Sequence, residues 1–88
     1  MKGSQDSELK EQLKILIIEE SDKEIDPQSI RDDELLFGEE SNIQLDSLDA
    51  IQLTMAIQKR YAVKITDSKE ARRAFATVNS LADTIQPE

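Results

Sequence analysis

The chain contains no cysteine, no histidine and no tryptophan among its 88 residues. Without cysteine, neither a disulfide nor a cysteine-ligated metal can hold the fold together. Without histidine, a Ser–His–Asp triad is excluded, and a zinc site loses its usual nitrogen ligand. Any chemistry at a serine of this chain must therefore be performed by another protein.

Glycine and aromatic residues are also scarce. The two glycines, Gly3 and Gly38, cannot form a glycine-rich phosphate loop. Aromatic residues make up only 3% of the chain, so the core must consist mainly of Leu, Ile, Val and Ala. Such a core favours packed helices over a sheet, in which β-branched and aromatic residues prevail. No apolar run approaches the roughly 20 residues that span a bilayer, so we expect no membrane insertion and a cytoplasmic location.

Negative charge dominates the composition, with a net charge of −8. Residues 1–50 carry 15 acidic and 5 basic side chains, whereas residues 51–88 carry 4 acidic and 6 basic ones. Nucleic acid is an unfavourable partner, because its phosphates require clustered Lys and Arg. Proteins with basic docking surfaces are the expected partners, because an acidic domain attracts them at long range. Acids that merely solvate loops and helix starts are the alternative. Asp22, Glu24 and Asp26 alternate as in a calcium loop, but Pro27 stands where glycine is required, so no metal site is expected.

Apolar periodicity predicts an all-α fold, a small bundle of three main helices and one short helix with a long first loop. The main helices are expected over residues 7–20, over residues 47–61 and from a cap at Thr77 until Pro87. The short one is expected to end near Phe75. The first helix has an apolar stripe formed by Leu9, Leu13, Leu16 and Ile17. Residues 6–86 are predicted to be a single domain, with residues 1–5 disordered and a helical turn in the loop near residues 32–37.

The helix over residues 47–61 is predicted to carry two apolar stripes. Asp46 is suited to cap its start, and Asp49 can complete a capping box. One stripe consists of Leu48, Ile51, Met55 and Ala56, and the other of Leu53, Ile57 and Tyr61. We predict that one stripe faces the core and the other a partner. Burial of both stripes inside a small bundle is the alternative.

Ser47 is the candidate site. With Asp46 as the cap, it stands at or near the first helical position, where backbone N–H groups lack intrahelical partners and the helix dipole is positive. Such a terminus accommodates a phosphate. Asp46 and Asp49 oppose a phosphodiester there unless a divalent cation bridges the charges during attachment, and that cation would belong to the modifying enzyme complex. An ordinary serine in the first turn of a capped helix is the alternative.

The segment Asp46-Ser47-Leu48-Asp49, followed by Ala50-Ile51-Gln52-Leu53-Thr54-Met55-Ala56-Ile57, resembles the attachment motif and second helix of the acyl carrier proteins. The resemblance extends over most of the chain. It includes an amphipathic first helix, a long loop, a short third helix and a closing helix that begins Thr77-Val78. It implies an acyl-carrier-like four-helix bundle and a carrier protein that is not an enzyme.

The resemblance implies that Ser47 accepts 4′-phosphopantetheine from coenzyme A through a magnesium-dependent phosphopantetheinyl transferase, with Asp46 helping to position the metal. The thiol of this arm then carries acyl groups as thioesters to acyl-loading, ketosynthase or acyltransferase enzymes. The chain is expected to be a monomer. The residues expected to contact partners are Leu48, Asp49, Ile51, Met55 and Lys59. The residues expected to line an acyl cavity are Leu53, Ile57 and Tyr61.

The chain departs from bacterial fatty-acid carriers around the motif. It has Gln44-Leu45 where they have a small pair such as Gly-Ala. Their second helix is strongly acidic, whereas residues 47–61 here contain one acid and two bases, and Arg72-Arg73 follow in the third helix. These differences favour a specialised carrier, for a polyketide or a modified lipid, over the housekeeping carrier of fatty-acid synthesis. An unmodified helical adaptor and an aminoacyl or peptidyl carrier are the alternatives.

Overall fold

The computed structural model describes residues 1–87, apart from the side chain of Ser68. Its α-helices are α1 (Ser7–Ser21), α2 (Ser47–Tyr61), α3 (Ser68–Ala74) and α4 (Val78–Ile85), and two short 3₁₀ helices are η1 (Gly3–Gln5) and η2 (Pro27–Ser29). The predicted all-α fold is confirmed, and α3 is the short helix. Among the helices that the structure describes, none combines the length and hydrophobicity needed to cross a bilayer.

Short polar side chains determine where the helices begin. The Asp6 carboxylate accepts the Leu9 N–H at 3.2 Å and caps α1. Asp67 caps α3 in the same way, and Thr77 forms a reciprocal capping box at the start of α4. Each cap satisfies a backbone donor that the helix itself leaves without a partner. The predicted starts of α1 and α4 are confirmed.

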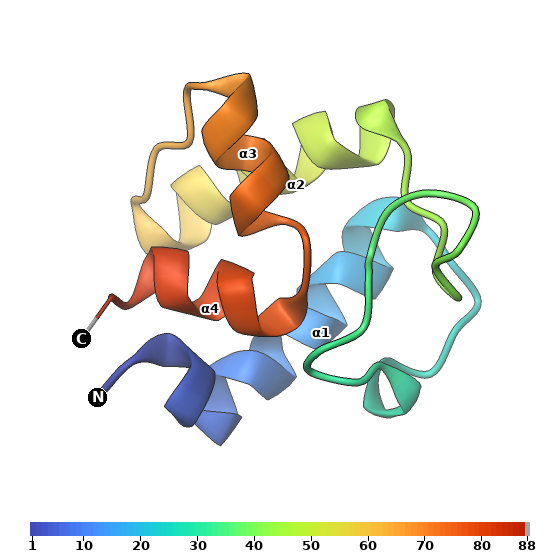
Figure 1. Cartoon of the computed structure of the whole chain (residues 1–88), viewed down its shortest axis with the longest axis horizontal. Coiled ribbons are helices and arrows are strands. Elements are labelled where there is room, and N and C mark those ends of the chain that lie inside the picture. Colours follow the sequence, from blue (N-terminus) through green and yellow to red (C-terminus); the bar gives the residue numbers. More distant parts are fainter. Residues whose placement is uncertain (88) are drawn as a thin grey trace.

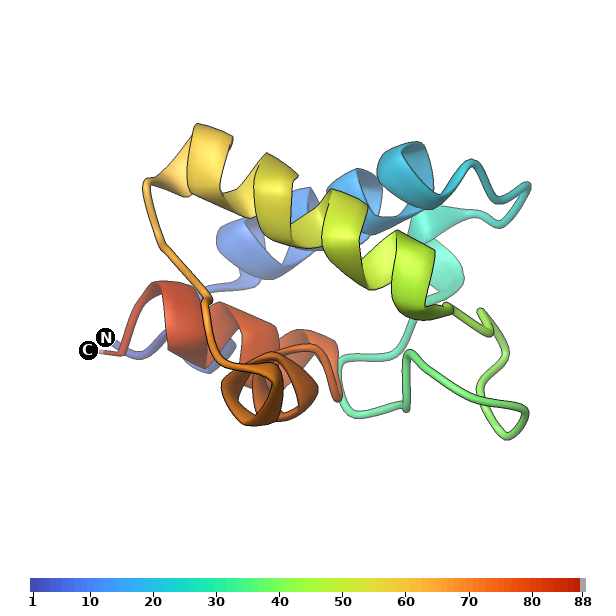
Figure 2. The ribbon, with the colours of Figure 1, turned by 90° about the horizontal axis from the view of Figure 1, so that it is seen from above.

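The helices pack around one hydrophobic core. Helix α2 lies beside α1, α4 packs against α1, and α3 packs against α4 (Figures 1 and 2). All four residues of the predicted α1 stripe are buried. The largest fully buried side chains come from α1, α2, α4, the long loop and the residue that ends α3. They are Leu13, Ile17, Leu36, Leu53, Ile57, Phe75, Val78 and Leu81. The core is therefore built mainly from aliphatic residues, as the composition predicts.

The helical turn predicted near residues 32–37 is wrong, because the short helix in this loop is η2. Pro27 favours a helical start through its fixed φ angle, and Asp26 caps it by accepting the Gln28 N–H at 2.9 Å. Further along, the backbone groups of Leu36 make long-range bonds instead. Its N–H donates to the Ala76 carbonyl at 3.1 Å, and its carbonyl accepts the Leu45 N–H at 3.0 Å.

The long loop between α1 and α2 is held against the core. Ile30, Leu36, Ile43 and Leu45 are all buried. The carbonyl of Asp32 also accepts the Asn79 N–H at 3.0 Å, which ties the loop to the start of α4. Leu35, by contrast, is 49% exposed, so the loop is fixed by only some of its apolar side chains.

The N-terminal residues pack against α4, in contrast to the disorder expected for residues 1–5. The Gly3 N–H donates to the Gln86 carbonyl at 2.7 Å, and the Ser4 N–H donates to Asp83 Oδ1 at 2.9 Å. The two termini therefore lie side by side, at the end of the molecule remote from the start of α2 (Figures 1 and 2). The limits of the carrier domain, residues 6–86, stay a prediction.

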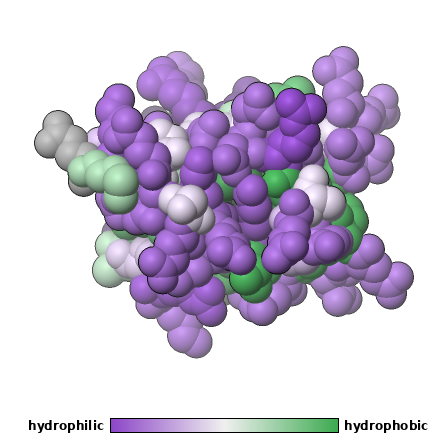
Figure 3. All heavy atoms as spheres, turned by 90° about the horizontal axis from the view of Figure 1, so that it is seen from below, coloured by the Kyte–Doolittle hydropathy of each residue, from purple (hydrophilic) through white to green (hydrophobic). Residues whose placement is uncertain are grey.

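The face seen from below is mostly hydrophilic. Figure 3 shows polar side chains over this face, with hydrophobic atoms visible mainly in the gaps between them. By contrast, α2 exposes three large apolar side chains, Leu48, Ile51 and Met55. Helix α2 is thus the place to look for a contact surface.

Candidate functional site

The start of α2 is fixed by two aspartates. Asp46 Oδ1 accepts the Asp49 N–H at 3.0 Å, and Asp49 Oδ2 accepts the Asp46 N–H at 3.1 Å. This reciprocal pair is a capping box, although Glu or Gln is the commoner residue at the second position. The predicted cap is confirmed, and it makes Ser47 the first residue of the helix.

Ser47 is exposed at this helix start. Within residues 1–87, its hydroxyl has no hydrogen-bond partner, and the backbone N–H groups of Ser47 and Leu48 have no acceptor. Free N–H groups and the positive end of the helix dipole suit an anionic group attached at this hydroxyl. The local geometry therefore leaves the hydroxyl available and accommodates a phosphate next to it.

A metal is not held here by the chain alone. Among the described residues, no group of three or more acidic, histidine or cysteine side chains is arranged to bind a metal ion. Asp46 and Asp49 use one oxygen each in the capping box. A cation that assists chemistry at Ser47 would therefore need further ligands from a partner or a substrate.

A cavity of about 620 Å³ opens beside Ser47. It lies between the start of α2, the end of α3 and the long loop. Its walls are mainly apolar, and the rings of Phe37 and Phe75 approach within 6.3 Å between their centroids, tilted by 54°. The lining residues are Leu35, Phe37, Leu45, Asp46, Ser47, Ala50, Ala71, Arg72, Phe75 and Ala76. An apolar group linked to Ser47 could enter this space directly.

The residues predicted to form an acyl cavity lie elsewhere. Leu53 and Ile57 are fully buried in the core. Tyr61 is half-buried, and its hydroxyl donates to Gln12 Oε1 of α1 at 3.4 Å. None of the three belongs to the lining of the cavity beside Ser47. The sequence analysis did not predict that Phe37 and Phe75 line a cavity. The one signal for them was that they are the two phenylalanines of a chain poor in aromatic residues.

The predicted contact residues divide into two groups. Leu48, Ile51 and Met55 are 68%, 58% and 66% exposed. Lys59, one turn after Met55, is also exposed. Asp49 is half-buried and engaged in the capping box. Of the first predicted stripe, only Ala56 turns toward the core, where it is partly buried.

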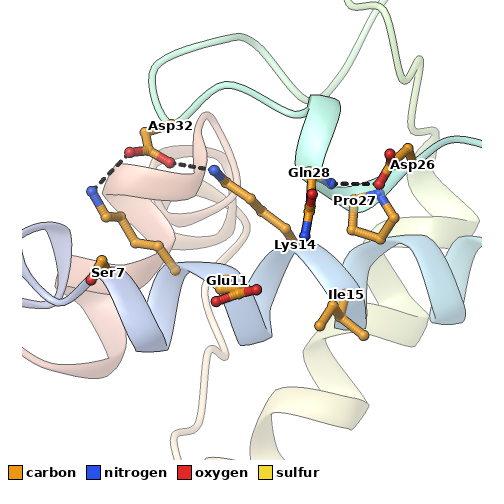
Figure 4. Close-up of a pocket in the computed structure, with 9 residues that line it drawn as sticks. Ser7, Glu11, Lys14, Ile15, Asp26, Pro27, Gln28 and Asp32 are labelled. Carbon is orange, nitrogen blue, oxygen red and sulfur yellow. Dashed lines mark hydrogen bonds and ion pairs between the residues drawn. The ribbon is translucent and has the colours of Figure 1, made fainter.

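A second hollow, of about 470 Å³, lies between α1 and the long loop (Figure 4). In it, Asp32 points from the loop to two lysines of α1. Lys10 Nζ donates to Asp32 Oδ2 at 2.8 Å, and Lys14 Nζ forms an ion pair with Oδ1 at 2.7 Å. The Lys10 hydrogen bond, followed by that of Lys14, lowers the pKa of Asp32 below its usual value of 3.8. This cluster fastens the loop to α1 on a part of the molecule separate from Ser47.

The comparison with protein families identifies the family of the chain. The family model described as "Phosphopantetheine attachment site" matches residues 9–85, which is most of the chain. No curated protein and no solved structure matches the chain significantly.

Proposed function

The chain belongs to the phosphopantetheine-attachment family, whose members are carrier domains and not catalysts, and from this premise we propose that it is an acyl carrier modified at Ser47. The family takes 4′-phosphopantetheine as a covalent cofactor. When bound, this group supplies the thiol that the chain lacks. The observation that carries the proposal is the apolar cavity that opens beside the exposed Ser47 hydroxyl.

Ser47 fits the attachment of the arm. In the transfer, its hydroxyl oxygen forms a bond to the phosphorus of the pantetheine phosphate, and the bond from that phosphorus to the adenosine 3′,5′-bisphosphate of coenzyme A breaks. The proton of the hydroxyl would pass to a base; the chain has no histidine to serve as one, so we propose that the transferase supplies it. Asp46 precedes Ser47 in the chain and has one carboxylate oxygen outside the capping box, with which it would share a Mg²⁺ ion with the transferase and coenzyme A.

The cavity favours an acyl group over an aminoacyl group. Each methylene moved from water into apolar surroundings contributes about 0.8 kcal/mol. An ammonium group in the same space would lose its hydration, and the lining residues offer only Asp46 as a carboxylate partner. We propose fatty acyl, polyketide or modified-lipid intermediates as the cargo, and favour a specialised pathway because α2 lacks the acidic face of fatty-acid carriers.

The partner enzymes we propose are a phosphopantetheinyl transferase and enzymes that load, condense or transfer acyl groups. These enzymes would bind the exposed side chains of Leu48, Ile51 and Met55 on an apolar surface of their own. Three large apolar side chains exposed together on one helix face are typical of a protein contact surface. We propose a monomer in the cytoplasm, which light scattering and cell fractionation would test.

Mass spectrometry tests the attachment. The protein is incubated with coenzyme A and a broad-specificity phosphopantetheinyl transferase, and the modified peptide is sequenced. We expect one pantetheinyl group, located on Ser47, and none on Ser47→Ala. The matched control is Ser7→Ala, because Ser7 is also the exposed first residue of an Asp-capped helix. No mass gain under permissive conditions would instead support the unmodified adaptor, and a gain at Ser7 would contradict the site.

Thermal denaturation tests the cargo. The transferase is supplied with acetyl, octanoyl or alanyl coenzyme A, so that each group is installed with the arm. With about 4–8 °C of Tm per kcal/mol for a domain of this size, the octanoyl form should melt about 10 °C above the acetyl form if half of its extra methylenes are buried. Ala50→Phe, which fills the cavity, should abolish the increase, whereas Gln52→Phe on the exposed side of α2 should not. An alanyl form as stable as the octanoyl form would favour an aminoacyl carrier.

A further inference from the structure

We propose that the face around Ser47 docks on an acidic protein surface, namely an apolar depression bordered by Asp and Glu side chains. The docking face consists of the exposed apolar residues Leu48, Ile51 and Met55 together with the basic residues Lys59 and Arg72. The inference rests on the proposed function in one respect, since a partner enzyme must reach Ser47.

Positive charge collects along α2 and the segment after it. Residues 50–66 contain no Asp or Glu and three bases, Lys59, Arg60 and Lys64, in a chain that has 19 acids and 11 bases. All three side chains are exposed. Within residues 1–87, the ion pairs join Lys10 and Lys14 to Asp32 and Arg31 to Asp33, so none of them neutralises these three bases. The same ion pairs do not involve Arg72 either, so the two cations of the docking face, Lys59 and Arg72, are available to a partner.

Lys59 and Arg72 border the apolar stripe and the cavity on different elements. Lys59 follows Met55 by four residues, which puts the two side chains one turn apart on the same side of α2. Arg72 is exposed on α3 and lines the cavity together with Ser47. A partner that receives Ile51 and Met55 and approaches Ser47 thus meets a cation at both places.

The acids nearest to Ser47 do not reverse this pattern. One carboxylate oxygen of Asp46 and one of Asp49 accept backbone N–H groups at 3.0 and 3.1 Å, at the positive end of the α2 dipole. The net charge of −8 acts on an acidic partner from a distance, but charges beyond about 8–10 Å are largely screened at physiological salt. At contact, the local cations of the docking face decide the preference.

The test uses two amphipathic helical peptides with the same apolar residues, one flanked by Glu and the other by Lys. Binding to the phosphopantetheinylated, ¹⁵N-labelled protein is followed by NMR, and the Kd of each peptide is measured. We expect the Glu-flanked peptide to bind at least fivefold more tightly and to shift the amides of Ile51, Met55 and Lys59. Equal affinity, tighter binding of the Lys-flanked peptide, or shifts confined to α1 and α4 would overturn the proposal.

Reversing the charge of single residues shows which cations cause the preference for the Glu-flanked peptide. Lys59→Glu and Arg72→Glu should each weaken the Glu-flanked peptide about fivefold and abolish the preference when combined. The matched control is Arg31→Glu, which makes the same charge change on an exposed loop residue outside the docking face. A control as damaging as Lys59→Glu would mean that only net charge matters. Circular dichroism verifies that each variant is folded.

Two further outcomes separate this inference from others. Stronger binding to phosphatidylglycerol vesicles than to the Glu-flanked peptide, lost in Lys59→Glu, would replace the protein partner by a lipid surface and overturn the proposal. Modification of Ser47 without any preference between the peptides would overturn this inference alone. Absence of modification would overturn the proposed function, whichever peptide binds.

Discussion

Replacing Asp32 by asparagine should loosen the loop that forms one wall of the cavity beside Ser47. The substitution keeps the shape of the side chain and removes its charge. Asp32 faces Lys10 Nζ at 2.8 Å and Lys14 Nζ at 2.7 Å, and the two lysine side chains are only 15% and 17% exposed. Because Asp32 itself is 37% exposed, solvent screens part of the attraction.

The expected loss of stability in Asp32→Asn can be estimated from the contacts of Asp32 with the two lysines. Screened pairs contribute up to about 1 kcal/mol each, and partly buried lysines left without a counter-charge add to the loss. We therefore expect Asp32→Asn to lower the free energy of unfolding by about 1–2 kcal/mol. For a domain of this size, that corresponds to a decrease in Tm of about 5–10 °C at pH 7.

The contribution of Asp32 to stability should decrease as the pH falls. The two lysines lower the pKa of Asp32 in the folded protein below its usual value of 3.8. The unfolded chain therefore binds the proton first as the pH falls, and stability decreases. The contribution is fully present above the unfolded pKa and is lost as the pH falls through the folded pKa. The difference in Tm between the wild type and Asp32→Asn should accordingly shrink below pH 3.8.

The neighbouring residue provides the control. Asp33 is 71% exposed and lies 3.7 Å from Arg31 Nε, so Asp33→Asn should change the stability by less than about 0.5 kcal/mol. Calorimetry or circular dichroism at pH 7 and pH 3 measures both variants. A cost at Asp33 equal to that at Asp32, or a difference in Tm that does not change with pH, would refute the reasoning.

Four other substitutions test the fold and the docking face. Ile51→Glu or Met55→Glu should weaken turnover by partner enzymes but change the Tm by only a few degrees, because both side chains are exposed; a comparable collapse in Tm would show that they stabilise the core. Gly3→Ala should destabilise the protein by about 1–3 kcal/mol in urea denaturation, since its Cβ would overlap the carbonyl of Ala82; an unchanged midpoint would contradict the packing of η1. Gln44→Gly should stabilise by about 0.5–1 kcal/mol, because Gln44 has a left-handed φ of 55°; destabilisation would mean that the Gln44 side chain contributes more than the strain.

The helices could be predicted because their signals are local. Asp46 and Asp49 are three residues apart, and a capping box needs no contact from elsewhere in the chain. Periodicity along one helix also separates Ile51 and Met55 from Leu53 and Ile57, but it left open which stripe is buried, and the resemblance to carrier proteins implied that Ile51 and Met55 face a partner. The same reasoning located Ser47 at the first turn.

The cavity could not be predicted in this way, because its walls come from segments far apart in the sequence. Phe37 in the loop meets Phe75 at the end of α3, and Leu36 bonds to Ala76 across the same gap. Apolar periodicity places Leu53 and Ile57 on an inward face, but it cannot tell filled core from open space. The expected acyl-cavity residues were therefore inward-facing, yet they lie away from the opening at Ser47.

The pairing of η1 with α4 has a practical consequence. Gly3 and Gln86 are hydrogen-bonded, so the first and last described segments lie together at one pole, while α2 begins at the other (Figure 1). An affinity tag, a fluorophore or a surface linker joined at either end would project away from the start of α2, where Ser47 is the proposed attachment residue. The domain is thus suited to immobilisation with its reactive pole facing the solution, and to grafting into a host loop whose two stems are close together.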